Sequence, residues 1–467
     1  MQALATLDML HHPDVLANVL SKLRSIPDAL ATLTDAVSHP IALALLASTV
    51  PAYLLLVRAR RWRLYNAVHA KYAHRIGTLT PVEAQEIVRV SAAWDMPALL
   101  IYALSFALMR TYAIPTISRI LMQTKELKLK DTVSKRFLDT AILAGTMALC
   151  PLSASTLPDT LPADPHAPPL DKAPVIEDDP RAFIAIARTN WLHGHYPILN
   201  EDFLYTLSLF IREPIRWAER YGWRPLSPLE SRFVLWKAVG EHMQFKDIPP
   251  TLEAMCEWSD AYEEAYAVPD QANHDLTSGM LSELVHTVPE AFGLRNFVLR
   301  IVYTLMEDRI REAMMFPAQP AWMHALVYGG MRTLAFAQRY LCLPRSKATL
   351  IVPLDALPAP KEAGKLARMH PDWKGPQPWY EAPRTGLARV WQAIGLGLGL
   401  VDPEYVPGPK WRSDGYRLEE IGPIRWENVG HAQVMKQAGE LRGCPVTGLW
   451  ARDVEVAVAA NGNEKAN

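Results

Sequence analysis

Apolar residues in this chain recur three or four positions apart in segment after segment, and no segment sustains the alternation of apolar and polar residues that marks a strand. Spacing of three or four places apolar side chains on one face of an α-helix. The sequence therefore predicts an all-α fold. With 467 residues, 50% of them hydrophobic, the chain is long enough to bury at least one large core.

The clearest helix start is in LTPVEAQEIVRVSAAW, where Thr80 can cap the helix, Pro81 takes the first helical position and Glu83 completes a capping box. The next segment has a 12-residue apolar run, 97–108, which is too short to span a bilayer and predicts a buried or interfacial helix. Similar spacing predicts further helices over 201–223, 227–243, 294–315 and 386–400.

The longest apolar run, IALALLASTVPAYLLLV at 41–57, carries no charge and is followed at once by the basic stretch RARRWR. As a helix it would cover roughly 25 Å, slightly less than the hydrocarbon core of about 30 Å. Arginines and a tryptophan at its end fit the cytosolic interface of a membrane. We predict a transmembrane anchor at 39–57 after an N-terminal segment, 1–38, with the rest of the chain cytosolic. An interfacial helix and a buried core helix are the alternative interpretations.

Two proline-rich regions divide the remainder. Eight prolines between 151 and 180 exclude regular structure and predict a surface insertion between two helices. The tail from 346 to 467 begins rich in Pro, Gly and Trp. Its Gly-x-Gly-x-Gly follows no predicted strand, which argues against a dinucleotide site.

Charge and motif patterns exclude several classes of function. A formal net charge of −1 gives no reason to expect a nucleic-acid partner. Four scattered cysteines predict neither a disulfide framework nor a zinc site. A di-iron bundle needs two Glu-x-x-His repeats, and only Glu283 and His286 have that spacing.

The segment RTNWLHGHYP contains two histidines, His193 and His195, near the end of a predicted helix. Asp179 is placed to cap this helix, Pro180 to begin it and Pro197 to stop it. The two side chains point about 200° apart on a helix, so they cannot both face one core. Periodicity alone leaves open which of them, if either, is a ligand.

A second constellation is SKRFLDTAIL, where Arg136, Asp139 and Thr140 are spaced to share one helix face. A solvated polar face and a buried polar pocket both fit this pattern.

Several segments occur together in a specific order along the chain: RRWRLYNAVHAKY, ALMRTYAIPTIS, KRFLDTAIL, ARTNWLHGHYPILNEDFLYTLSLF, GWRPLSPLESRFVLWKAVGEHM, IPPTLEAM and RYLCLPR. In this order they resemble the MpaB-like ER-bound oxygenases of fungi, which share a catalytic domain with rubber oxygenases, the latex clearing proteins. The resemblance covers residues 58–345, the expected catalytic domain, and extends loosely into the C-terminal extension at 346–467.

The resemblance implies a globin-like helical core that binds haem b through one histidine. His193 matches the iron ligand, His195 a variable position, and Arg136 and Thr140 match polar residues near the other face of the haem. Rubber oxygenases have a lysine where this chain has Asp139, so a lysine-assisted dioxygen step is not carried over. Arg188 is a candidate partner for a haem propionate.

The implied reaction uses O2 to cleave a carbon–carbon double bond in an isoprenoid or meroterpenoid chain. The expected partners are a lipophilic small molecule, O2 and the lipid of the endoplasmic reticulum membrane. A haem hydroxylase or epoxidase and a non-enzymatic membrane-anchored helical protein are the alternatives. Glu241 and His242 are expected to be structural, since a polar helix end needs no catalytic reason.

Overall fold

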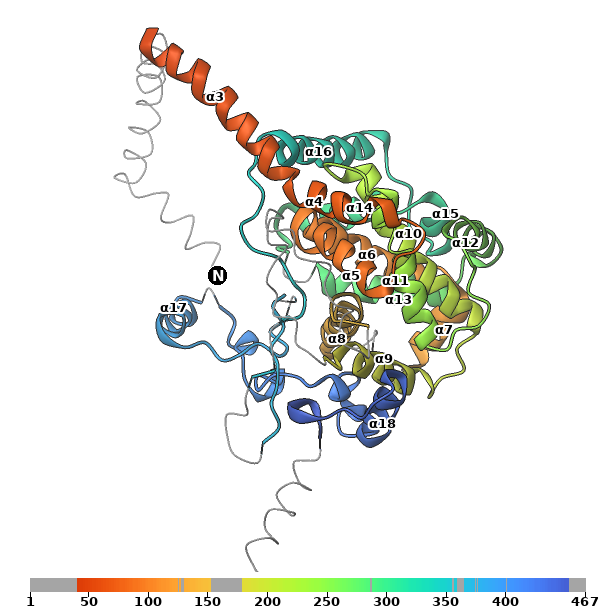
Figure 1. Ribbon diagram of the computed structural model, residues 1–467. Coiled ribbons are helices and arrows are strands. Elements are labelled where there is room, and N and C mark those ends of the chain that lie inside the picture. Colours follow the sequence, from red (N-terminus) through yellow and green to blue (C-terminus); the bar gives the residue numbers. More distant parts are fainter. Residues whose placement is uncertain are drawn as a thin grey trace, which may run out of the picture. The chain divides into compact units, whose positions relative to one another are not determined.

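The computed structural model describes residues 40–124, 126, 130–152, 179–285, 288–354, 357–358, 365–373, 375, 377–399 and 401–452, with the side chains of the first helix described from Ala47 (Figure 1). Over these residues the structure contains helices and no strand, and a single bridge pairs Met369 with Tyr416. The predicted all-α class is confirmed. The N-terminal segment 1–38 and nearly all of the proline-rich insertion lie outside the described residues.

The α-helices of the described part are α3 (Pro40–Arg61), α4 (Arg63–Tyr72), α5 (Pro81–Arg89), α6 (Pro97–Thr111), α7 (Pro115–Thr124), α8 (Lys130–Leu149), α9 (Arg181–His193), α10 (Asn200–Tyr221), α11 (Phe233–His242), α12 (Leu252–Tyr266), α13 (Gln271–Leu284), α14 (Leu294–Leu305), α15 (Asp308–Ala313), α16 (Ala321–Tyr340), α17 (Gly386–Gly397) and α18 (His431–Arg442).

The sequence signals differ in how accurately they predict where helices begin and end. Thr80 accepts a hydrogen bond from the backbone of Glu83, whose carboxylate accepts one from Thr80, so the predicted capping box is confirmed. The helix predicted over 294–315 is wrong as one unit, because extended backbone at Met306 and Glu307 separates α14 from α15. Periodicity continues across such a break because both helices pack on the same core.

One structural unit contains α3 together with Tyr340–Leu343. The hydroxyl of Tyr53 donates to the carbonyl of Leu341 at 2.8 Å, and Nη2 of Arg61 to that of Cys342 at 2.6 Å. The described apolar side chains of α3 are largely exposed, Leu55 to 67%. Within the described residues no single helix passes a length-and-hydropathy test for a membrane span; Pro81–Asp95 and Pro97–Thr111 pass only as a pair, bent by 110°.

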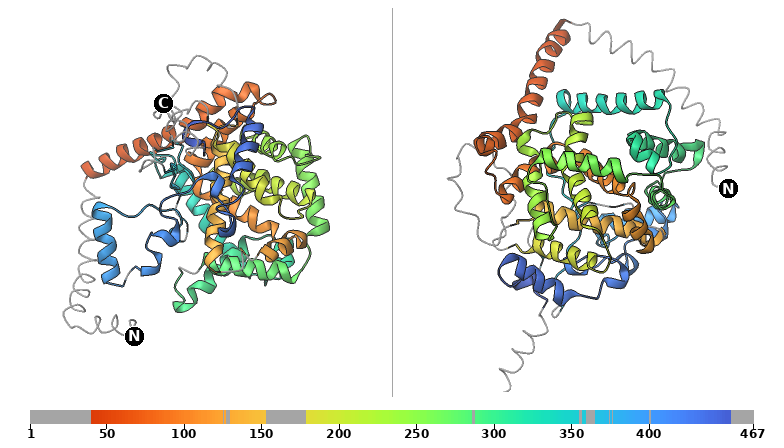
Figure 2. Two further views of the ribbon diagram at one scale, coloured as in Figure 1. Left: turned by 90° about the horizontal axis from the view of Figure 1, so that it is seen from below. Right: turned by 90° about the vertical axis from the view of Figure 1, so that its right-hand side faces the viewer.

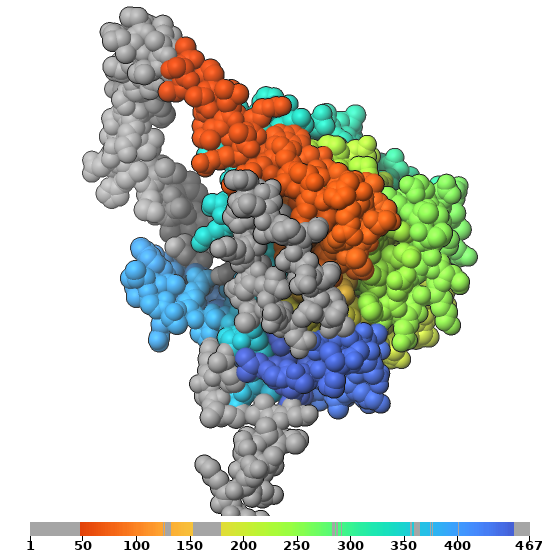
Figure 3. Space-filling view, in the orientation of Figure 1, coloured from red at the N-terminus to blue at the C-terminus, as the bar shows by residue number. Residues whose placement is uncertain are grey.

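The other unit holds the large core. Helix α9 is packed between α8 on one side and α18 of the C-terminal extension on the other (Figures 1 and 2). Its residues 182–187, Ala-Phe-Ile-Ala-Ile-Ala, are at most 2% exposed, because three alanines let neighbouring helices approach closely. The last described residues of the extension, dark blue in Figure 3, cover one face of this unit. The extension is therefore part of the fold around α9.

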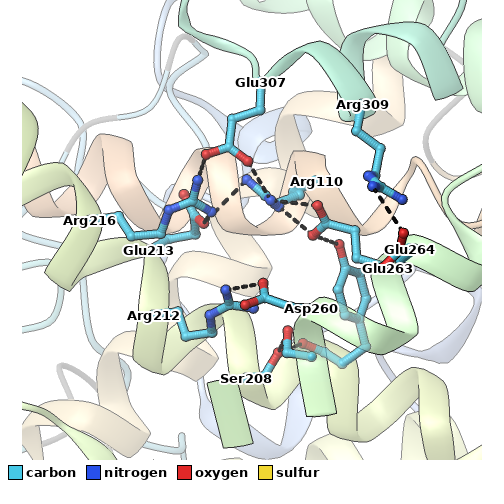
Figure 4. Close-up of polar contacts among 12 residues, drawn as sticks. Arg110, Ser208, Arg212, Glu213, Arg216, Asp260, Glu263, Glu264, Glu307 and Arg309 are labelled. Atoms are coloured by element: carbon cyan, nitrogen blue, oxygen red, sulfur yellow. Dashed lines mark hydrogen bonds and ion pairs between the residues drawn. The ribbon is translucent and has the colours of Figure 1, made fainter. Parts of the chain in front are cut away.

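A buried ion cluster joins α6, α10 and α12 (Figure 4). Arg110 donates to both oxygens of Glu263, at 2.9 and 2.7 Å, and to Glu307 at 2.7 Å, and lies 3.5 Å from Glu213. Arg216 also pairs with Glu213 and Glu307. Burial by itself would lower the pKa of Arg110, but Glu213 and Glu263 outweigh burial and raise it. The cluster fixes α6 against α10, and both helices line the cavity described next.

Candidate functional site

A cavity of about 240 Å³ lies among α6, α7, α8, α9, α10, α11 and α13. Most of its lining side chains are apolar. The polar and ionisable ones are Ser105, Thr111, Tyr112, Arg136, Thr140, Thr189, His193, Asp202 and Thr206. An apolar cavity with a few convergent polar groups is the usual form of a small-molecule site.

His193 is the last residue of α9 and lines this cavity. Its Nδ1 is buried and has no hydrogen-bond partner among the described residues. Burial, and then the positive charge of Arg136, lower the pKa of His193 to about 4. The imidazole is therefore neutral at neutral pH, which is the form that binds a metal.

Arg136 and Thr140 of α8 line the same cavity, so the structure brings them together with His193. The Thr140 hydroxyl donates to the backbone carbonyl of Arg136 at 2.9 Å, which leaves its oxygen able to accept. In the described part of the chain, the Arg136 guanidinium makes no hydrogen bond or ion pair. A cation without a partner at an apolar cavity favours an anionic or oxygen-bearing ligand group.

Asp139 is placed differently from its expected role. It does not line the cavity and is 1% exposed on another side of α8. Its carboxylate accepts from Lys135 at 2.9 Å and from the hydroxyl of Tyr380 at 2.8 Å. The expectation that Asp139 shares the face of Arg136 and Thr140 is corrected: three residues along a helix is a turn of about 300°, and the C-terminal extension packs on that side.

Arg188 also departs from its expected role. It is fully buried, and its guanidinium donates to the carbonyls of Ile421, Trp426 and Val429 at 2.7, 2.7 and 2.8 Å. It does not line the cavity. Its hydrogen bonds hold the C-terminal extension against α9, so the structure gives no support to the expected contact with a haem propionate.

His195 lies in the turn after α9, which ends two residues earlier than the sequence predicted. Its side chain is exposed, and Nδ1 is 2.7 Å from the carbonyl of Trp191. The start of α9 is also shifted by one residue: Pro180 is the cap and Asp179 accepts from the backbone of Arg181 at 3.0 Å. The two histidines therefore have different surroundings, with only His193 at the cavity.

Glu241 and His242 stay outside the cavity lining. Glu241 forms an exposed pair with Lys237 at 3.1 Å, and the ring of His242 packs edge-on against Phe183. Both contacts fit the structural role expected for this helix end.

The sequence patterns did not indicate Asp202, although it lines the cavity in the first turn of α10. Its Oδ1 accepts from Thr116 at 2.8 Å and from Tyr262 at 2.7 Å, while Oδ2 is buried with no partner among the described residues. Burial raises its pKa. An acidic residue in a first turn reads as a favourable helix-dipole contact, so no sequence signal separated this aspartate from ordinary ones.

Across the described residues, no group of three or more His, Cys, Asp or Glu side chains is arranged to hold a metal ion. His193 is the one histidine among the described residues that line the cavity.

Comparison with known proteins places these residues in a family context. A family model described as the catalytic domain of ER-bound oxygenase mpaB/B' and rubber oxygenase matches residues 186–338. ER-bound oxygenase mpaB' of Penicillium brevicompactum is 30% identical over 446 residues, 90% of this chain and 97% of that protein. ER-bound oxygenase mpaB of Penicillium roqueforti is 31% identical over 287 residues, 57% of this chain and 87% of that protein.

Proposed function

The chain belongs to the family of ER-bound oxygenases mpaB and mpaB', which shares its catalytic domain with rubber oxygenases, and from this membership we propose a haem-dependent oxidative cleavage of a carbon–carbon double bond. The substrate would be a hydrophobic isoprenoid or meroterpenoid chain. The observation that supports the proposal most is the neutral imidazole of His193, whose Nδ1 is buried without a partner among the described residues, on the wall of a largely apolar cavity.

The residues present fit haem b held in a globin-like core. His193 would hold the iron through an imidazole nitrogen, and its buried Nδ1 lacks a partner among the described residues. A haem held through one histidine would supply the chemistry that binds and activates dioxygen. Arg136, which lines the same cavity, would supply a positive charge to oxygen-bearing groups near the other face of the haem.

The side chains around His193 have separate tasks in this proposal. Apolar walls from α6, α8 and α11 bind the hydrocarbon chain and exclude water from it. The oxygen of Thr140 is able to accept a hydrogen bond, and Asp202, whose pKa is raised by burial, can hold or release a proton at Oδ2.

We assign α3 as a single-pass anchor in the endoplasmic reticulum membrane, with the catalytic domain in the cytosol. Its exposed Leu54, Leu55 and Leu56 and the arginines at its end support this assignment. Carbonate extraction of microsomes should leave the full chain in the pellet. Release of the chain into the supernatant would contradict the anchor.

The decisive experiment is the absorption spectrum of the purified full-length protein. We expect a Soret band in the wild type, its loss in His193→Ala, and its retention in the matched variant His195→Ala. A wild type without haem, or a His193→Ala protein with undiminished haem, would overturn the assignment.

Product analysis separates cleavage from its alternative. Double-bond cleavage divides the substrate into two carbonyl fragments, whereas hydroxylation or epoxidation adds one oxygen and keeps the chain intact. Mass spectrometry after incubation with a prenylated aromatic test compound distinguishes the two results.

A further inference from the structure

A second cavity, of about 90 Å³, adjoins the first. Side chains of α6, α8, α10 and α11 line both, among them Ser105, Phe137, Thr140, Phe210 and Trp236. A ligand that extends from one cavity into the other would lie against these shared side chains. The two cavities therefore form two ends of one potential binding path.

Small side chains on one face of α8 leave the space that the second cavity occupies. Ala141, Ala144, Gly145 and Ala148 recur at intervals of three and four residues, so they form a single stripe along the helix. A Cβ at Gly145 would lie 3.2 Å from the side chain of Ile351, which shows how closely the opposite wall approaches there. The cavity suits a slender hydrocarbon chain.

Arg232 lines this largely apolar cavity. It is 5% exposed and precedes α11. Its Nη2 donates to the hydroxyl of Ser91 at 3.2 Å, while Nη1 is buried with no partner among the described residues. The nearby carboxylate of Glu230 is already occupied by Arg224, at 2.7 and 2.8 Å.

Two other buried arginines of the same unit, Arg224 and Arg188, have their guanidinium groups engaged by acceptors of the chain itself. Arg224 binds two carboxylates, and Arg188 binds three carbonyls. Burial lowers the pKa of Arg232 only to about 10, so it remains a cation at neutral pH. A buried cation with an unused donor is costly unless a ligand supplies the missing acceptor, and a carboxylate matches the planar guanidinium best.

We infer that the second cavity binds the carboxylate end of an elongated lipophilic substrate, with Arg232 as the hydrogen-bond donor and the chain extending past Thr140 toward His193. This assignment rests on the proposed function for the reaction at His193. It adds the chemical class of the substrate, a prenyl-type chain that ends in a carboxylate.

The first test compares farnesoic acid with methyl farnesoate by isothermal titration of the full-length protein in one detergent at pH 7.5. Both probes have the same chain, and only the acid carries a charge. We expect the wild type to bind the acid about ten- to a hundredfold more tightly, the usual worth of a charged hydrogen bond. Equal affinities would overturn the inference without any variant.

Substitutions test whether Arg232 and the second cavity are responsible for the preference for the acid over the ester. Arg232→Gln should reduce the acid-to-ester ratio to about one, and Arg309→Gln, which removes an exposed charge elsewhere, should leave it unchanged. Ala148→Leu reduces the volume of the second cavity and keeps the charge of Arg232, so it should weaken both probes. A preserved ratio in Arg232→Gln, or undiminished binding in Ala148→Leu, would contradict the subsite. Thermal unfolding of each variant verifies that it is folded.

The outcome is distinguishable from that of the proposed function. His193→Ala should keep the acid-to-ester ratio, since His193 does not line the second cavity. If the protein contains haem but binds the acid and the ester equally, the carboxylate subsite is ruled out and the proposed function is not. If the protein contains no haem but prefers the acid, and this preference depends on Arg232, the proposed reaction is ruled out and the carboxylate subsite is not.

Discussion

The hydroxyl of Tyr380 donates a hydrogen bond to Oδ1 of Asp139 at 2.8 Å, although 241 residues separate them in the sequence. Lys135 joins the same group, since its ammonium lies 2.9 Å from Asp139 and 3.1 Å from Glu427. The C-terminal extension thus supports one side of α8, while Arg136 on another side of the same helix lines the cavity. The extension is part of what holds the candidate site in place.

Tyr380→Phe should destabilise the fold by about 1 to 3 kcal/mol, because a buried carboxylate loses a donor. Chemical denaturation of the purified protein measures this change. Tyr303→Phe is the control, since the half-buried Tyr303 makes no hydrogen bond through its hydroxyl among the described residues and should change stability by less than about 0.5 kcal/mol. Equal effects of the two substitutions would show that the Asp139 contact contributes nothing specific.

Arg188→Lys should loosen the C-terminal extension from α9. A lysine can satisfy at most part of the three carbonyls that the guanidinium binds, so a loss of about 2 to 4 kcal/mol is expected. Hydrogen exchange should increase over residues 421–431. Arg425→Lys, an exposed arginine of the same segment, should leave the exchange unchanged. Unchanged hydrogen exchange over residues 421–431 in Arg188→Lys would show that Arg188 does not hold the C-terminal extension against α9.

Neighbouring glutamates of α12 test the ion cluster of Figure 4. Glu263→Gln should destabilise the protein by about 3 to 5 kcal/mol, because Arg110 loses its main buried partner. Glu264→Gln alters a side chain that is 76% exposed and only weakly paired with Arg309, so its effect should stay within about 0.5 kcal/mol. Similar unfolding midpoints for both variants would argue against the Arg110–Glu263 pair as a link between α6 and α12.

Stability should fall as the pH drops from about 6.5 to about 4. The unfolded chain protonates its histidine near pH 6.5, whereas His193 in the fold stays neutral down to about 4, so the unfolded state binds more protons in this window. At pH 5 this amounts to about 2 kcal/mol relative to pH 7.5.

The comparison that isolates this effect uses haem-free wild type and His193→Gln, unfolded with urea at both pH values. Glutamine does not titrate, so the variant should lack the additional loss at low pH. The same slope in both proteins would mean that His193 is not buried in its neutral form.

The parts of this protein that depend on the local order of residues along the chain could be predicted from the sequence. Apolar spacing predicted the helices, and the capping residues at Thr80 predicted one start correctly. The order of segments placed Arg136, Thr140 and His193 together in the resemblance, and the structure lines one cavity with all three. It did not indicate Asp202 or Arg232, whose significance depends on buried polar atoms without partners.

By itself the sequence determined the helical class, most helix positions and the family, because periodicity, caps and ordered motifs are properties of neighbouring residues. Only the tertiary structure decided which polar residues of α8 and α9 face the cavity. Asp139 and Arg188 turn away because the C-terminal extension, more than 200 residues later in the chain, supplies their hydrogen-bond partners. A buried polar group takes the side where its partners are, and no local pattern records partners so distant in sequence.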